Sequence, residues 1–505
     1  MLCAKRMTWI VLAAVSFAAK SCGDDGRSGS DLDASADGDS DTDTDSDTDA
    51  DADTDTDSDA ETPQGYTWHA FYGNEIADNG NSITLDEDGN LYVVGTSAPY
   101  SWNGPGDESP LHDHSGGTDT FVQKLSPDGS YQWHTFYPGS GMSIALDASG
   151  HIYVVGSCAS SWDGPSGEAP LHAHSGDGDL MVLKLDADGT YQWHTFYGWT
   201  YFDHGSAIAI GPSDDLYIAG LSDDTWEGPS GEGPLHGYEG SGWNTVILKL
   251  SSSGVYQWHT FYQGEVGYSI AVDGSDDLYL TSSSYDPWNG PEGEDPLNAY
   301  SGEPGVGEVL VLKLGSTGAY EWHAFYGSVD GWDYSNAVVV ADSGEVYLTG
   351  RSEFSWTGPA GEIPIDAHSG GEGAAFQLAL DADGAYLWHS FCGEGNGSAI
   401  AIEEDGDLYI TGGSGYWQGP GGESPLNGYF NEDIFVLKLS SNGVYEWHTF
   451  YGGGAMDWGN SIAVSGSGEI YTAGTSAGSW VGPDLEPALS EYSGEADAVV
   501  LKLAP

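Results

Sequence analysis

The sequence predicts an all-β fold: a seven-bladed β-propeller of four-stranded antiparallel blades, closed by the N-terminal strand joining the last blade. Three observations predict it. One unit recurs seven times at steps of 59 to 66 residues. Each unit holds four short apolar segments separated by turns rich in Gly and Asp. The repeat region also starts with the segment that ends the other units.

The clearest marker of the repeat is a Trp-His dipeptide inside an aromatic segment. The second copy shows the parts in order: the aromatic segment Tyr131–Tyr137, the segments Ser143–Asp147 and Ile152–Gly156, a long loop over 161–176, and Met181–Leu185. β-Branched and aromatic residues dominate these segments, and no 3.6-residue period runs far enough for a helix. The seven dipeptides begin at Trp68, Trp133, Trp193, Trp258, Trp322, Trp388 and Trp447.

The order of the strands from the axis outward follows from side-chain size. Blades diverge outward, so the small and aliphatic residues of Ser143–Leu146 suit the innermost strand, A, and the aromatic segment suits the outermost strand, D. Asp-Gly dipeptides such as Asp128-Gly129 indicate hairpin turns. The region starts with a D strand, Tyr66–Tyr72, and ends with A, B and C strands. We therefore expect the first strand to complete the seventh blade and remove an exposed edge.

The last copy carries the most specific pattern, in Gly459–Val464, Gly468–Ser476 and Asp497–Leu503. On these motifs, residues 66–505 resemble the bacterial seven-bladed β-propeller repeat family. The resemblance implies a secreted or surface protein of bacteria and supplies no catalytic motif.

The charge of the chain is extreme, with 79 acids against 11 bases and a formal net charge of -68. Such a surface repels phosphate backbones and anionic lipid headgroups, which excludes nucleic acid as a partner. Two interpretations of the acids stay open, solubility in a salty or calcium-rich exterior and cation binding. No cofactor is identified and no metal site is assigned, but Ca²⁺ is a candidate.

The N-terminus has the pattern of an export signal over residues 1–21. Lys5 and Arg6 precede an apolar run that is too short to span a bilayer, and the run leads to Cys22. The segment around Cys22 resembles a bacterial lipobox, in which the cysteine is lipidated, although Lys20 departs from that motif. Ordinary signal cleavage is the alternative. The sequence thus predicts an exported chain, an outer-membrane or cell-surface lipoprotein or otherwise a secreted protein, that meets the membrane only through a lipid on Cys22.

Residues 22–65 form a linker in which aspartate stands at nearly every second position. Like charges repel and no apolar residue drives collapse, so we expect a disordered acidic tether. The Gly and the closing Glu of an EF-hand loop are absent from its Asp runs. The propeller is expected over residues 66–505, as a monomer.

Strand direction places the D–A and B–C connections on one face, the loop face, and only tight turns on the other. Each B–C loop carries Trp-x-Gly-Pro followed by a glutamate. A Trp platform such as Trp102, Trp162 or Trp226, with a carboxylate and a histidine, suits stacking on a sugar ring. The alternative is that the Trp anchors its loop and the Glu binds backbone amides. The glutamates are Glu108, Glu168, Glu232, Glu294, Glu362, Glu423 and Glu486.

Two further sets of residues repeat with the blades. The strand-D histidines lie on separate blades, too far apart to share a metal ion, so structural hydrogen bonds are expected of them. Six strand-C lysines each follow an acid or amide by five residues, and the fifth blade lacks both, at Ala374 and Ala379. Five extended residues span ~16 Å, so direct pairing is not expected. The loop glutamate is a candidate intermediary.

Catalytic signals are weak. Residues 66–505 hold a single arginine, Arg351, and carry no nucleophile elbow, HExxH motif or phosphate loop. Acid–base chemistry needs one differentiated pair of groups, whereas most carboxylates here are copied seven times.

The copies differ most in their D–A connections, four of which are longer than the rest. The long connections carry extra aromatic residues, and one B–C loop carries an extra tryptophan. These residues are candidates for ligand binding, with packing over the channel mouth as the alternative: Trp199, Tyr201, Phe202, Trp332, Tyr334, Trp458 and Trp243.

Three functions fit these observations. The first is a non-enzymatic, envelope-tethered surface propeller that binds a glycan or an extracellular protein. The second is an extracellular polysaccharide lyase or hydrolase that uses loop-face carboxylates. The third is a purely structural envelope protein.

Overall fold

The computed structural model describes residues 65–238, 242–264, 268–371 and 373–505, all within the unit Glu61–Pro505. The expected signal peptide, Cys22 and the tether up to residue 64 lie outside this range. Every regular element of the described residues is a β-strand. This part of the chain holds no helix with the length and apolar character needed to cross a membrane.

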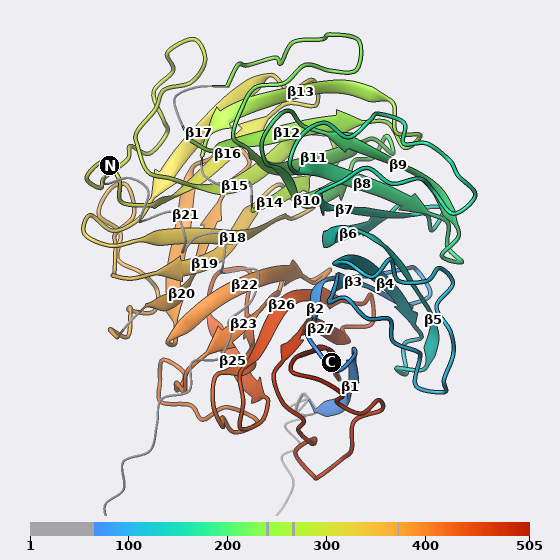
Figure 1. Cartoon of the computed structure of the whole chain (residues 1–505). Helices are drawn as coiled ribbons and strands as arrows, with labels where there is room; N and C mark the ends of the chain where they lie inside the picture. The colour runs from blue at the N-terminus through green and yellow to red at the C-terminus, as the bar shows by residue number, and fades with distance from the viewer. Residues whose placement is uncertain (1–64, 239–241, 265–267, 372) are drawn as a thin grey trace, which may run out of the picture. The chain divides into compact units, whose positions relative to one another are not determined.

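The strands form seven four-stranded antiparallel sheets arranged as a ring of blades (Figure 1). In blades 1 to 6 the chain runs outward through strands A, B, C and D, in the order that the residue sizes predicted. Blade 1 is β2–β5, blade 2 is β6–β9, and the numbering continues to blade 6, β22–β25. Blade 7 combines β26, β27 and β28 with β1.

The A strands are β2 (Asp78–Leu85), β6 (Ser140–Leu146), β10 (Asp203–Ile210), β14 (Ser269–Val272), β18 (Asp333–Val340), β22 (Gly395–Ile402) and β26 (Asp457–Val464). The B strands are β3 (Leu91–Ser97), β7 (Ile152–Cys158), β11 (Leu216–Ser222), β15 (Leu278–Ser284), β19 (Val346–Ser352), β23 (Leu408–Ser414) and β27 (Ile470–Ser476).

The C strands are β4 (Asp119–Leu125), β8 (Asp179–Leu185), β12 (Asn244–Leu250), β16 (Glu308–Leu314), β20 (Ala374–Leu380), β24 (Asp433–Leu439) and β28 (Asp497–Leu503). The D strands are β5 (Tyr131–Pro138), β9 (Tyr191–Tyr197), β13 (Tyr256–Gln263), β17 (Tyr320–Tyr326), β21 (Tyr386–Cys392), β25 (Tyr445–Tyr451) and β1 (Tyr66–Tyr72).

The predicted closure is confirmed. Strand β1 pairs antiparallel with β28, from Tyr66 opposite Leu503 to Tyr72 opposite Ala498. The blue first strand therefore lies beside the red strands of the last blade (Figure 1). Since β1 supplies the outer strand of blade 7, the edge of β28 is covered and the two ends of the ring are hydrogen-bonded together.

Six of the seven A strands extend further toward the loop face than the sequence predicted. In blade 2 the strand begins at Ser140, not Ser143, and pairing with strand B continues past a bulge between Gly141 and Ser143. A glycine in strand B makes room for this bulge. A Cβ on Gly156 would lie 1.8 Å from the carbonyl oxygen of Ser140, so only glycine fits there.

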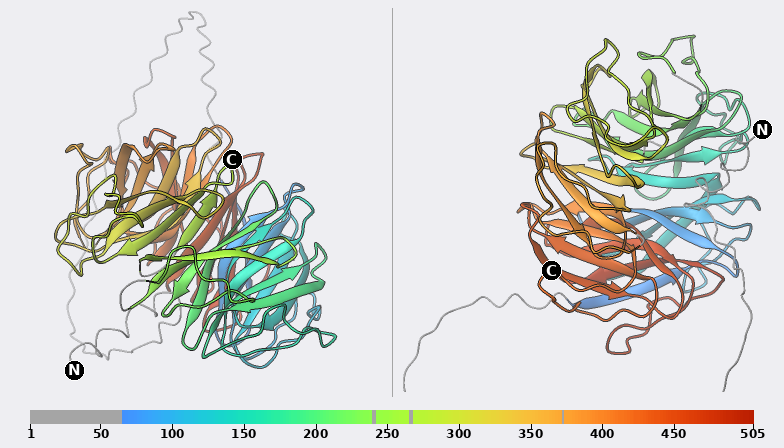
Figure 2. Two further views of the ribbon diagram at one scale, coloured as in Figure 1. Left: turned by 90° about the horizontal axis from the view of Figure 1, so that it is seen from above. Right: turned by 90° about the vertical axis from the view of Figure 1, so that its left-hand side faces the viewer.

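The core lies between neighbouring blades. One cluster joins Tyr153 and Val182 of blade 2 to Ile218, Leu248 and Phe261 of blade 3, and all five are fully buried. Burial of this kind contributes ~25 cal/mol per Å² of apolar surface. Because each blade packs on two neighbours, its stability depends on the whole ring, which Figure 2 shows from two further sides.

The two faces of the ring differ as predicted. Tight turns join strand A to strand B and strand C to strand D. In one of these turns Gly89 has a positive φ, and its amide donates to the backbone carbonyl of Asp86. On the loop face the ends of the two loop types meet. The amide of Asp203, which ends a D–A loop, donates to the carbonyl of Gly178, which ends a B–C loop of the preceding blade, at 2.8 Å. We call such a contact a blade junction.

Candidate functional site

Every B–C loop is held to its blade by one Trp–His–Tyr arrangement. In blade 4 the ring of Trp288 stacks on His323 with centroids 3.8 Å apart. The His323 Nε2–H donates to the carbonyl of Trp288 at 3.1 Å, and its Nδ1 accepts from the hydroxyl of Tyr320 at 2.7 Å. A carbonyl can only accept, so these bonds fix the neutral Nε2–H tautomer.

Burial keeps these histidines uncharged. Desolvation is the largest cause that lowers the pKa of His323 to about 4, against the opposing effects of the Trp288 carbonyl and Glu294. The same shift holds for the other six rings: His69, His134, His194, His259, His389 and His448. The expected structural hydrogen bonds of the strand-D histidines are thus confirmed.

The loop tryptophans serve these anchors. Trp102 and Trp226 are only 6% and 3% exposed, and Trp162 stacks on His194 at 3.6 Å. Stacking on the histidine and packing against the neighbouring strand support the anchor interpretation, and sugar binding by these rings stays a prediction. Sequence could not separate the two interpretations, since a repeated anchor and a repeated binding site leave the same sevenfold pattern.

The loop glutamates also act within their own loops. Glu108 Oε2 accepts the amide of Gly106 at 2.8 Å, and the equivalent bond recurs in every blade. They do not contact the strand-C lysines, so the expected intermediary role is wrong and the alternative of amide binding is confirmed.

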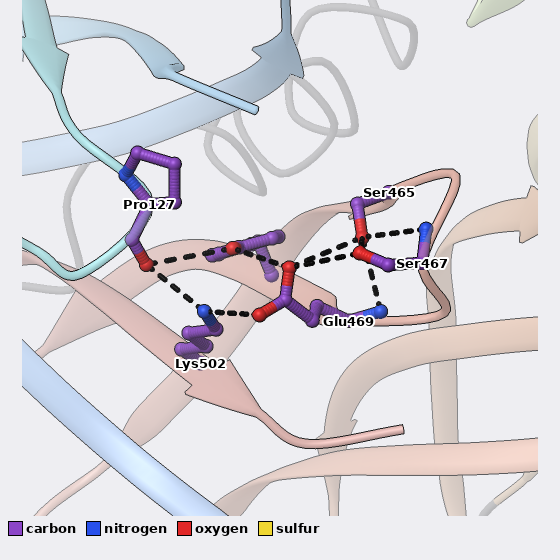
Figure 3. A network of polar contacts seen from close by, with 6 residues as sticks. Pro127, Ser465, Ser467, Glu469 and Lys502 are labelled. Carbon is purple, nitrogen blue, oxygen red and sulfur yellow. Dashed lines mark hydrogen bonds and ion pairs between the residues drawn. The ribbon is translucent and has the colours of Figure 1, made fainter. Parts of the chain in front are cut away.

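Strand-C lysines join neighbouring blades on the face opposite the loops. Figure 3 shows Lys502, whose Nζ lies 2.6 Å from Glu469 in the A–B turn of its own blade and 3.0 Å from the carbonyl of Pro127 in blade 1. The ammonium group also lies 5.1 Å from the ring centroid of Tyr471. The lysine therefore joins two blades through an ion pair, a hydrogen bond and a cation–π contact.

The same arrangement recurs around the ring. Lys249, Lys313 and Lys438 lie 3.0, 3.3 and 2.7 Å from turn acids of their own blades. Direct pairing with the acid five residues earlier was not expected, and the partners lie instead in the turn. Blade 5, with Ala379, lacks the ammonium group.

The acids that begin the C strands meet a second acid that the sequence analysis did not single out. At four junctions, the first residue of the next A strand is also an aspartate, and both side chains are buried. These four carboxyl pairs are Asp179 with Asp203, Glu308 with Asp333, Asp433 with Asp457, and Asp497 with Asp78. Aligning the copies would have revealed the second aspartate, which occurs only after long D–A connections.

The pKa of Asp203 and of Asp333 is raised to about 7, with desolvation as the largest cause and the charge of the other acid of each pair acting in the same direction. A serine hydroxyl and one backbone amide oppose the shift. At Asp203 these groups are Ser222 and the amide of Trp199.

The aromatic candidates divide into exposed and packed residues. Trp199 and Tyr201, on the D–A connection of blade 3, are 54% and 55% exposed. Phe202 is half-buried and meets Trp243 edge to face at 6.1 Å. Among the described tryptophans, Trp199 alone is mostly exposed. These four residues form one patch on the loop face, which we call the blade-3 aromatic patch.

The remaining candidates lie on blades 5 and 7. Trp332 stacks on Tyr334 at 6.0 Å and meets Tyr285 at 5.2 Å. Trp458 donates from Nε1 to Ser398 Oγ of blade 6 at 3.1 Å. The structure brings Trp332 and Tyr334 together, but Trp458 serves a contact between blades. The role of all these residues in ligand binding stays a prediction.

Comparison with known families agrees with this geometry. Residues 66–98, which span β1 to the end of β3, match a family model described as a beta-propeller repeat. Together with the seven blades of the structure, this match confirms the β-propeller repeat expected from the sequence. The fold and this repeat suggest a binding or scaffold role.

Known proteins add little to this assignment. The regulatory protein FlaEY of Caulobacter vibrioides is 23% identical over 362 residues, which cover 65% of this chain and 35% of that protein. The chain thus spans about a third of this curated relative. The WD40 beta propeller domain of Doa1 is 9% identical with a TM-score of 0.47, covering 88% of this chain and 97% of that one. BamB from Moraxella catarrhalis is 11% identical with a TM-score of 0.39, covering 87% and 99%.

Proposed function

We propose that the chain is a non-enzymatic binding propeller of the cell exterior, tethered through its N-terminal segment, and that the blade-3 aromatic patch binds a glycan. The observation that carries the proposal is the exposure of Trp199 and Tyr201 in a protein whose other described tryptophans are stacked or packed. Flat exposed aromatic rings suit stacking on the apolar faces of sugars.

The repeated residues support a binding protein more than an enzyme. The usual acid–base groups serve structural contacts: the strand-D histidines and loop glutamates make equivalent contacts in all seven blades, and the strand-C lysines make ion pairs or hydrogen bonds in six. The patch differs because only blade 3 carries it. A site that occurs once on a symmetric scaffold is where selective recognition is expected.

The test is a glycan array probed with the full chain and with a Trp199→Ala/Tyr201→Ala variant. The matched control is Tyr100→Ala, because Tyr100 is 60% exposed but lies on a B–C loop of blade 1. We expect binding that the double variant loses by tenfold or more and the control retains. Equal binding by all three proteins would show that the glycan binds elsewhere on the chain. Binding only to proteins in an extract would show that the ligand is a protein and not a glycan.

Two further measurements separate the alternatives. Hydrolysis or lyase turnover of extracellular polysaccharides by the purified chain would favour an enzyme over a binding protein. Incorporation of a labelled fatty acid that Cys22→Ala abolishes would support the lipid tether, whereas incorporation that persists in this variant would contradict it.

A further inference from the structure

Two of the four carboxyl pairs hold an oxygen atom that the described residues leave without a hydrogen-bond partner. Asp179 is completely buried, and its Oδ2 accepts the amide of Ser175 at 2.7 Å while its Oδ1 has no hydrogen-bond partner. Glu308 Oε2 is likewise buried and without one. At the junction with a single acid, both oxygens of Asp119 accept hydrogen bonds from Ser115. Both orphan oxygens thus occur where a second carboxylate faces the first, whereas the carboxyl oxygens of the other two pairs accept hydrogen bonds from nearby backbone amides and polar side chains.

The two carboxylates of a pair border the same small space. This space lies over the glycine that follows strand D. A Cβ on Gly452 would lie 2.6 Å from both Asp433 Oδ1 and Asp457 Oδ2, and a Cβ on Gly73 would lie 2.8 Å from Asp497 Oδ1 and from Asp78 Oδ2. The glycine leaves open a position that oxygens from two blades surround.

The lysines do not neutralise this charge. Each strand-C lysine stands five residues from the acid or amide that begins its strand, ~16 Å away, and five of the six pair with a turn acid on the opposite face. The exception among the junctions is instructive. Between blades 5 and 6 both acids are replaced, one by Ala374 and the other by Gly395. The single arginine of residues 66–505, Arg351, lies at this junction. A Cβ added to Gly373 would lie 2.6 Å from Arg351 Nε.

Two carboxylates in a buried site repel each other unless a proton or a cation lies between them. A pair of oxygens from two acidic side chains is the donor type that hard divalent cations prefer. We propose that each of the four carboxyl pairs binds one divalent cation of the calcium class, which links strand C of one blade to strand A of the next.

The experiment uses terbium(III), which takes the same oxygen ligands as calcium and emits when a nearby tryptophan is excited. Each pair lies beside a tryptophan in sequence or in space: Trp102, Trp199, Trp332 and Trp480. The acidic segment 22–65 has no aromatic residue, so terbium held there is not sensitised. The full chain, treated with a chelator, is titrated with terbium, and Ca²⁺ is then added as competitor.

Two variants remove a pair in different ways. Asp179→Asn/Asp203→Asn neutralises one pair at constant size, whereas Gly452→Ala keeps both carboxylates of another pair and fills the space between them with a methyl group. We expect each variant to lose about a quarter of the sensitised emission. In the wild type, added Ca²⁺ should displace terbium and so lower the emission. The thermal midpoint of the wild type is expected to rise with Ca²⁺ by more than that of either variant.

The control is Asp405→Asn, in the exposed turn where Glu403, Asp405 and Asp407 lie within reach of one ion. Asp407 already pairs with Lys438 at 2.7 Å, so this variant is expected to leave emission unchanged. Emission that depends on Asp405 but not on either pair would overturn the proposal, as would emission that neither pair variant alters. Failure of the glycan array leaves this result untouched, because the patch and the pairs are tested with different variants.

Discussion

The Trp–His–Tyr anchors make the stability of the propeller depend on pH through neutral histidines. An unfolded histidine has a pKa near 6.5, while burial lowers the pKa of folded His323 to about 4. Between these values the unfolded state binds more protons, so stability present above pH 6.5 is lost as the pH falls toward 4. From pH 7 to pH 5 each ring should cost ~2 kcal/mol of unfolding free energy.

Seven such rings amount to ~13 kcal/mol, which is comparable with the whole stability of a typical domain. Buried acids such as Asp203, whose raised pKa has the opposite effect, reduce this total. The informative quantity is therefore the effect of removing one ring. Replacing His323 by Gln keeps a donor for the Trp288 carbonyl but removes the titrating group, and the residues around it, Tyr320 and Glu294, stay in place.

The assay is urea unfolding followed by tryptophan fluorescence at pH 7 and pH 5. On acidification the wild type should lose ~2 kcal/mol more unfolding free energy than His323→Gln. For a His259→Gln/His323→Gln double variant, the difference from the wild type should be twice as large. If the single variant lost as much stability as the wild type between the two pH values, the histidine would already be charged at pH 5 in the folded protein, and the reasoning from burial would be wrong.

Three further predictions concern the scaffold. Gly474→Ala should lower the unfolding free energy by ~3 kcal/mol in urea unfolding, because its Cβ would lie 2.0 Å from the carbonyl oxygen of Trp458; an unchanged midpoint would contradict the bulge geometry. Lys502→Met keeps the apolar stem but loses the ion pair with Glu469, so a loss of ~1–2 kcal/mol that shrinks at high salt is expected in the same assay. Deleting Tyr66–Tyr72 uncovers the edge of β28, and size-exclusion chromatography should show aggregated rather than monomeric protein; a monomeric, folded product would show that the ring does not need this strand.

The sequence by itself determined the scaffold of this protein. The repeat of Trp-His dipeptides set the number of blades, the small residues of Ser143–Leu146 and the aromatic D strands set the radial order, and the leading strand Tyr66–Tyr72 set the closure. These features are local patterns copied seven times, so side-chain size and strand direction were enough to place them.

Only the tertiary structure decided what the polar side chains do. Lys502 meets Glu469 in the A–B turn of its blade and Pro127 of another blade, and Asp179 meets Asp203 across a junction. These partners are brought together by the closing of the ring, so spacing along the chain did not reveal them. Likewise, burial of Trp102 and exposure of Trp199 follow from which residues cover each ring. The sequence around Trp102 or Trp199 does not reveal whether its ring is buried, because packing between blades determines which surfaces remain open to solvent.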